Sequence, residues 1–275
     1  MTSLATALSA VAGRPAGGVL VVALAVLTGQ LSIGWSNDLL DQRRDRAAGR
    51  RDKPLVSGQV SARTVLLCCA AAVTACVPLS LASGWRAGLC HLVVVVGGWA
   101  YNLGLKRTVL SFLPYAVSFG SLTAFLALGL PGRPAPHAWL VAAGALLGLG
   151  AHFLNVLPDI EADRAGGVLG LPQRLGAVRS RASGALLLAA AAAAVTFGPA
   201  GRPPGWALVG LVAALLLAAA AALTGRQPGS RLPFLLALAT AVVTVLLLIG
   251  RGADLGRGSA DAEAAGHGRP AAAAR

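Results

Sequence analysis

Long apolar stretches, separated by short polar or basic connections, run along almost the whole chain. Eight of them are candidate membrane-spanning helices: 19–36, 65–83, 88–105, 109–130, 138–157, 182–197, 206–223 and 232–249. Most approach the roughly 20 residues that a helix needs to cross a bilayer. An earlier apolar stretch, 4–12, ends at Gly13-Arg14-Pro15 and is too short to cross about 30 Å of hydrocarbon, so it is either the remnant of a truncated span or a half-helix at the interface. The pattern predicts an all-α polytopic bundle of about nine helices, the first of them short or truncated.

Composition supports a membrane protein. Hydrophobic residues make up 56% of the 275 residues, charged residues only 12%, and the mean hydropathy is +0.72. A soluble domain of this composition would lack the polar surface to cover itself. We therefore expect one transmembrane domain over residues 1–250, followed by a disordered tail rich in Gly, Ala and Arg over 251–275.

The positive charges alternate between the loops. One set of loops carries Arg43, Arg44, Arg46, Arg50, Arg51, Lys53, Arg63, Lys106, Arg107, Arg164, Arg174, Arg179, Arg181, Arg226 and Arg231. The intervening loops carry only single charges, at Arg14, Arg86, Arg133 and Arg202. Because basic loops stay inside the cell, this asymmetry predicts a multi-pass protein of the cell membrane whose heavily basic side faces the cytoplasm. The net charge of +13 is then mostly a topology signal and does not indicate nucleic-acid binding.

Most of the ten acidic residues fall in two short clusters, at 37–45 and 155–163, both at cytoplasmic helix ends. On a continuous helix each cluster would share one face, because the polar residues recur every three or four positions: Asp38, Asp41 and Asp45 in the first, and Asn155, Asp159 and Asp163 in the second. Stacked carboxylates repel one another, so a positive partner must offset them. Neighbouring arginines could do so, but two clusters of the same design favour a divalent cation, and hard oxygen ligands suit Mg²⁺.

Bound Mg²⁺ of this kind usually presents a diphosphate. Lys53, Lys106 and Arg107 could neutralise further phosphate oxygens, the lysines as point charges and the arginine as a fork. Taken singly, each is by default a topology anchor at an inner helix end.

Both clusters resemble motifs of the UbiA superfamily of intramembrane prenyltransferases. Residues 37–45 match the family's NDxxDxxxD pattern completely and are followed by Asp52-Lys53-Pro54-Leu55-x-x-Gly58. Residues 155–163 and the following Arg164-Ala165-Gly166-Gly167 are similar to the second motif, and Tyr101-x-x-x-x-Lys106 is similar to a Tyr-to-Lys element whose common spacing is one residue shorter. The resemblance extends over residues 17–250.

The resemblance implies helices around a chamber, with the two motifs meeting at its cytoplasmic mouth over Mg²⁺ and an isoprenyl diphosphate. It also implies transfer of the prenyl group to a lipophilic, often aromatic acceptor that it does not identify. The implied metal ligands are Asp38, Asp41, Asp45, Asp159 and Asp163, which with Lys106 form the catalytic set. The implied substrate-binding residues are Asn37, Asn155, Tyr101, Lys53, Arg107 and Arg164. Glu161 points off the stripe of Asp159 and Asp163 and stays outside the metal shell.

Two alternatives remain open. A membrane terpene cyclase would ionise the same diphosphate and let the allylic cation close on itself. A transporter would place charged residues near mid-bilayer, where the predicted spans offer none except His91 near a helix start. In either enzyme an aromatic face could stabilise the cation, and the candidates are Trp35, Tyr101, Tyr115, Phe119 and Phe153. For His152 we favour a structural role over contact with an acceptor.

Overall fold

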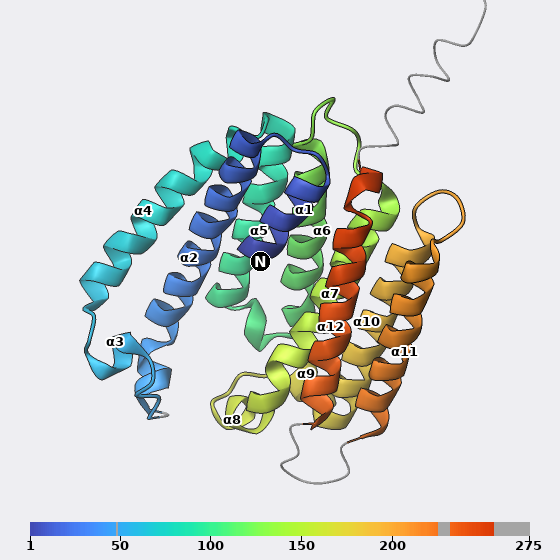
Figure 1. Ribbon diagram of the computed structural model, residues 1–275. Helices are drawn as coiled ribbons and strands as arrows, with labels where there is room; N and C mark the ends of the chain where they lie inside the picture. The colour runs from blue at the N-terminus through green and yellow to red at the C-terminus, as the bar shows by residue number, and fades with distance from the viewer. Residues whose placement is uncertain (48, 225–231, 256–275) are drawn as a thin grey trace, which may run out of the picture.

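A computed structural model describes residues 1–47, 49–224 and 232–255 of the chain (Figure 1). Every regular element in these ranges is helical. The α-helices are α1 (Thr2–Val11), α2 (Ala16–Ala47), α3 (Pro54–Ser57), α4 (Ala62–Leu81), α5 (Trp85–Leu103), α6 (Leu113–Leu128), α7 (Ala138–Val156), α8 (Ile160–Ala165), α9 (Leu171–Leu175), α10 (Ala177–Phe197), α11 (Gly205–Leu223) and α12 (Leu232–Gly250). Short 3₁₀ turns connect several of them.

The predicted membrane bundle is confirmed. Among the described residues, seven helical segments are long and apolar enough to cross a bilayer. The remaining predicted span is α5, which is as long as α11 and α12, with 19 residues each, but carries Arg86, His91 and Asn102. The apolar stretch at the start forms the short helix α1, which lies against α2 and α12. Residues 252–255 form the 3₁₀ turn η4 (Gly252–Leu255), and the rest of the predicted tail lies outside the described residues.

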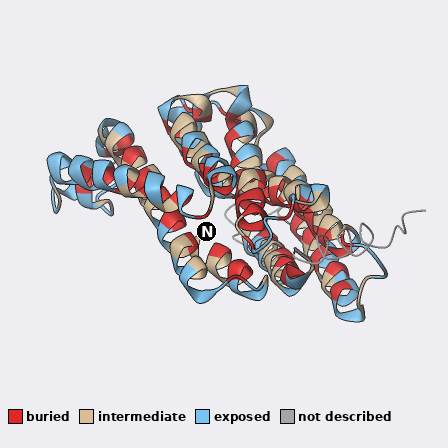
Figure 2. Ribbon diagram, turned by 90° about the horizontal axis from the view of Figure 1, so that it is seen from above, coloured by how far each residue is buried: buried red, intermediate tan, exposed pale blue. Residues whose placement is uncertain are grey.

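The long helices pack in an order that follows the chain. Helix α2 packs against α4 and α5, α5 against α6, α6 against α7, and α7 against α10, which in turn packs against α11 and α12. Large apolar side chains such as Leu67, Leu186 and Val209 are exposed. Figure 2 shows that exposed positions, in pale blue, recur along the helices of the bundle. A bilayer would cover these side chains, because spanning helices satisfy their own backbone and turn apolar groups to lipid.

Small residues set the close approach of α6 and α7. A Cβ atom added at Gly148 would lie 2.5 Å from the carbonyl oxygen of Tyr115 and 2.7 Å from Cβ of Phe119. One at Gly144 would lie 2.7 Å from the carbonyl oxygen of Phe119. Membrane helices that approach this closely depend on small side chains, since packing replaces the hydrophobic effect as the driving force.

We expect Gly148→Ala to lower the free energy of unfolding by about 1–3 kcal/mol, the usual cost of overpacking a well-filled interface. The obstacle is backbone, which cannot rotate away as a flexible side chain can. The matched control is Gly205→Ala in the first turn of α11, where an added Cβ meets no atom within 4 Å. Thermal unfolding of the purified protein should show a lower Tm for the first variant only, and equal Tm values would contradict the packing argument.

Candidate active site

The first acidic motif lies on the last turns of α2. The helix continues unbroken to Ala47, so Asp38, Asp41 and Asp45 share one face, as predicted. Asp41 and Asp45 are 2% and 1% exposed, whereas the Asp38 side chain is 37% exposed. Buried carboxylates near the negative end of a helix dipole are unfavourable unless cations lie beside them.

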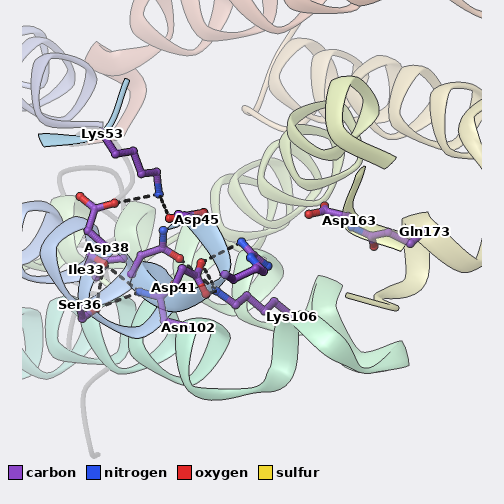
Figure 3. A network of polar contacts seen from close by, with 12 residues as sticks. Ile33, Ser36, Asp38, Asp41, Asp45, Lys53, Asn102, Lys106, Asp163 and Gln173 are labelled. Carbon is purple, nitrogen blue, oxygen red and sulfur yellow. Dashed lines mark hydrogen bonds and ion pairs between the residues drawn. The ribbon is translucent and has the colours of Figure 1, made fainter. Parts of the chain in front are cut away.

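Two lysines, both labelled in Figure 3, and Arg44 supply this charge. Lys106 Nζ lies 2.8 Å from Asp41 Oδ1 and 2.6 Å from Asp41 Oδ2, and Arg44 Nη2 lies 3.0 Å from Asp41 Oδ2. Lys53 Nζ donates to Asp45 Oδ2 at 2.7 Å and to Asp38 Oδ1 at 3.0 Å. The three carboxylates thus contact cations from two separate parts of the chain. Lys53 precedes α4, and Lys106 follows α5.

Local structure directs each lysine to α2. Lys53 precedes Pro54 at the start of α3, where an extended backbone turns its side chain back over the motif. Lys106 lies in the 3₁₀ turn η1 (Leu105–Arg107) after α5. Asn102, whose Nδ2 donates to the Ile33 carbonyl at 2.8 Å and to Ser36 Oγ at 2.9 Å, fixes that end of α5 against α2. The sequence prediction gave Asn102 no role; a lone amide at the end of an apolar run was the available signal.

The two lysines differ in their electrostatics. Burial lowers the pKa of Lys53, but the hydrogen bonds and charges of Asp45 and Asp38 outweigh it, so the net pKa is raised. For Lys106, burial dominates and the pKa is lowered, although Asp41 opposes the shift. The charged form of Lys106 is therefore less stabilised by its surroundings than that of Lys53. An added phosphate oxygen beside Lys106 would stabilise its charge.

The second motif is less regular than its spacing suggests. Helix α7 ends at Val156, a 3₁₀ turn η3 (Leu157–Asp159) follows, and α8 begins at Ile160. Pro158, which has no N–H to continue the α-helical ladder, lies in this turn. The predicted single face of Asn155, Asp159 and Asp163 is therefore interrupted at Pro158.

The structure brings the motifs together. A Cβ at Gly166, just after the second motif, would lie 3.8 Å from Cδ of Arg44 on α2. Asn37 and Asn155, the first residues of the two motifs, line one cavity of about 470 Å³. Asp163 accepts a hydrogen bond from Gln173 Nε2 at 2.9 Å, and Arg164 Nε donates to the Gln173 carbonyl at 2.6 Å (Figure 3 shows Asp163 and Gln173). Gln173, which is 2% exposed, is a further residue of this region, and the sequence analysis gave it no role.

The other wall of this cavity is apolar and aromatic. Tyr101, Tyr115 and Phe119 line it, together with Ile33, Val94 and Met1. The Tyr101 and Tyr115 rings meet edge to face with centroids 5.3 Å apart. The remaining aromatic candidates, Trp35 and Phe153, are not among its lining residues.

His152 lies behind this wall, 1% exposed. Its Nε2 is 3.1 Å from Ser111 Oγ, which accepts from the backbone N–H of Leu171 at 2.9 Å. These contacts support the structural role that we favoured, because they connect α7 through Ser111 to Leu171, the first residue of α9.

The remaining predicted site residues are more open. Asp159 and Arg107 are exposed, and Arg164 is exposed and contacts α9. Within the described residues, no group of three or more His, Cys, Asp or Glu side chains is arranged as a ready-made metal site. The donor chemistry nevertheless fits Mg²⁺, which is usually held by one or two carboxylates plus substrate phosphates and water rather than by a complete protein cage.

Solved structures of known proteins share this fold. An apo UbiA homologue from Aeropyrum pernix K1 superimposes with a TM-score of 0.71 at 23% identity, over 91% of this chain and 95% of that one. A UbiA homologue from Archaeoglobus fulgidus bound to GPP and Mg²⁺ gives 0.65 at 19% identity, over 92% and 96%. A structure described as digeranylgeranylglyceryl phosphate synthase gives 0.68 at 18%, over 92% and 91%. No curated protein sequence matches the chain significantly. The family profile of the UbiA prenyltransferases matches residues 1–241, and the chain therefore belongs to the UbiA prenyltransferase family.

Proposed function

We propose that this protein transfers an isoprenyl group from an isoprenyl diphosphate to a lipophilic, often aromatic acceptor, with Mg²⁺ as cofactor. The observation that carries the proposal is the shared cavity, which has Asn37 and Asn155 of the two acidic motifs on its wall and Tyr101, Tyr115 and Phe119 facing it from α5 and α6. Such a cavity can hold the charged end of a substrate at the motifs and its hydrocarbon end among apolar side chains.

The family relatives support the choice of substrate and metal. The Archaeoglobus fulgidus homologue is bound to GPP and Mg²⁺ in one structure and to DMAPP and Mg²⁺ in another. This chain has carboxylates in two motifs that could bind Mg²⁺, and nearby cations that could bind a diphosphate. Asp38, Asp41, Asp45, Asp159 and Asp163 would hold the metal, and Mg²⁺ so bound would neutralise the diphosphate as its bond to carbon breaks.

The ion pairs of the cluster suggest how the chain prepares for this charge. Lys53 and Lys106 neutralise buried carboxylates that would otherwise repel one another. A diphosphate placed beside them offers the ammonium groups oxygen acceptors, leaving carboxylate oxygens for a divalent cation. Lys106, with a lowered pKa, gains most from a new anionic partner. Its proposed role is to bind and stabilise the leaving diphosphate.

The apolar part of the cavity has a different task. Breaking the carbon–oxygen bond separates an allylic cation from the diphosphate, and water would capture that cation. Tyr101 and Tyr115 line the cavity, and the quadrupole of an aromatic face attracts a cation. We therefore assign these rings to shielding and stabilising the prenyl cation until the acceptor attacks it.

The orientation belongs to the same proposal. The basic loops at the end of the bundle that carries α3, α8 and α9 would face the cytoplasm of a cell membrane. The diphosphate would then enter from the side where soluble isoprenyl diphosphates are available.

A membrane assay tests the function. Isoprenyl diphosphates and aromatic acceptors are supplied with and without Mg²⁺, and diphosphate release and the organic product are both measured. We expect metal-dependent release that Asp38→Ala and Asp159→Ala each reduce by about 10²-fold or more, because one charge-stabilising contact is worth that much. Glu161→Ala is the control, since this exposed residue lies outside the proposed metal shell.

The organic product distinguishes a prenyltransferase from a terpene cyclase. A prenylated acceptor supports transfer, and a cyclic hydrocarbon made without acceptor supports a terpene cyclase instead. If no diphosphate turns over with any acceptor, or if Glu161→Ala falls as far as Asp159→Ala, the proposed site is wrong.

A further inference from the structure

A second polar pocket lies at the other end of the bundle from the acidic motifs. It has a volume of about 280 Å³ and is formed by the α1–α2, α4–α5 and α6–α7 connections. In Figure 1 these connections lie at the end opposite α3, α8 and α9. Its lining includes Arg14, Ser83, Gly84 and Arg133, and we call it the Arg14 pocket.

Arg14 is an unusual residue for such a position. It is only 9% exposed, and its Nη1 is buried without a hydrogen-bond partner. The side chain passes between two glycines: a Cβ at Gly18 would lie 2.7 Å from Arg14 Nε, and one at Gly129 would overlap Arg14 Nη1. Ser83 Oγ, also in the pocket lining, is likewise buried without a partner. A buried guanidinium and a buried hydroxyl without acceptors are costly, so they indicate a missing acceptor.

The surrounding charge has one sign. Arg133 lines the pocket, and Arg86 and Arg133 line an adjoining hollow. In the described part of the chain, no carboxylate forms an ion pair with Arg14, Arg86 or Arg133, and Asp254 near this end is paired with Arg251 at 3.1 Å.

The N-termini of helices α2 and α5 also favour an anion at this pocket. Helix α2 begins at Ala16, beside Arg14, and α5 begins after Gly84, which has no side chain to cap it. Neither helix has an acidic residue in its first turn. The free N–H groups and positive dipole ends of α2 and α5 thus add to the arginines, a combination that favours anions.

The level of the pocket relative to the membrane indicates the source of its anion. Trp85 and Trp206, at the first turns of α5 and α11 on this end, are 64% and 49% exposed. Exposed tryptophans at helix ends are typical of the membrane–water interface, at the level of the lipid headgroups. Arginine forks match phosphate oxygens well.

We propose that the Arg14 pocket binds the phosphate group of an anionic membrane phospholipid, in preference to a zwitterionic one, a role separate from the diphosphate site at the other end of the bundle. The phosphate accepts hydrogen bonds from the guanidinium groups of Arg14 and Arg133 and from Ser83. Bound lipid would then join the α1–α2, α4–α5 and α6–α7 connections and stabilise the bundle.

Thermal unfolding in nanodiscs tests this site. The purified protein is placed in phosphatidylcholine alone, in phosphatidylcholine with phosphatidic acid, and in phosphatidylcholine with inorganic phosphate at constant ionic strength. A ligand that binds only the folded state raises Tm. We expect phosphatidic acid to raise the Tm of the wild type by several degrees, and Arg133→Gln, which changes an exposed residue, to lose most of that rise.

Arg202→Gln is the matched control, because Arg202 is an exposed arginine at the same end outside the pocket lining. It should keep the full rise, whereas Arg14→Gln should lose it; if Arg14→Gln does not fold, Arg133→Gln decides. A rise with inorganic phosphate that depends on the same arginines would support the phosphate site but assign it to free phosphate. No rise in the wild type, or an equal rise in Arg133→Gln and Arg202→Gln, overturns the proposal, because an anion at the diphosphate end would stabilise both variants alike.

Discussion

Replacing Asp41 by asparagine is expected to lower diphosphate release from an isoprenyl diphosphate by about 10²- to 10³-fold. Asp41 is the most heavily engaged carboxylate of the site, contacting Lys106 through both oxygens and Arg44 through one. Asparagine keeps the size of the side chain but removes the charge that would hold Mg²⁺. Because the affected interaction acts on the developing diphosphate charge, kcat should fall more than KM rises.

The control for this variant is Asp52→Asn. Asp52 lies in the loop before α3, its side chain is 70% exposed, and its nearest cation is Arg50 at 3.9 Å. It therefore undergoes the same chemical change on the same side of the protein without touching the cluster. Steady-state kinetics at several Mg²⁺ concentrations compare the two variants. Similar losses in both, or an Asp41→Asn enzyme with wild-type kcat, would contradict the assignment.

Lys106→Met should affect both stability and activity. Lys106 is 5% exposed and its ammonium is paired with buried Asp41. Methionine retains the volume but leaves Asp41 with Arg44 as its remaining cation. Breaking a buried pair by removing one partner costs about 3–5 kcal/mol, and Arg44 should keep the loss near the lower end. The same change removes a cation from the diphosphate, so KM for the diphosphate should rise and kcat should fall.

The neighbouring residue provides the comparison. Arg107→Met removes a cation one position away, but Arg107 is exposed and forms no ion pair within the described residues. We expect its Tm to stay near that of the wild type and its kinetic change to be the smaller of the two. Unfolding scans and diphosphate titrations on both variants measure this. Equal shifts in Tm would mean that burial of the pair does not set the cost, and a larger kinetic loss in Arg107→Met would make Arg107 the principal diphosphate ligand.

The helices could be predicted from sequence because their signals are local. An apolar run of about 20 residues, bounded by Gly, Pro or Arg, has few alternatives to a spanning helix. The beginning of α4 is an example: Ser61 precedes the apolar run, serine is a favoured residue at a helix N-cap, and Ser61 Oγ accepts from the backbone N–H of Thr64 at 3.0 Å. The shortness of α1 was equally visible, because Gly13 and Pro15 end the apolar stretch.

The first acidic motif was predictable for a similar reason. Its regular spacing makes physical sense only on a continuous helix, and α2 does continue through it. The second motif shows the limit of such reasoning. Its spacing was equally regular, yet Pro158 replaces part of the α-helix by a 3₁₀ turn. Whether a proline bends, tightens or ends a helix depends on the packing around it.

The sequence by itself determined the class of the molecule, its helices, and the two groups of carboxylates, because composition, hydrophobic length and residue spacing are properties of the chain alone. Only the tertiary structure decided which cation neutralises which carboxylate. Lys106 reaches Asp41 from a position 65 residues away, and Asn102 holds that segment in place through α2. The tertiary structure also decided that Arg14 Nη1 is buried without an acceptor. In the sequence, Arg14 is simply one basic residue in a loop. Such pairings depend on distances between helices far apart in the chain, and no local pattern encodes them.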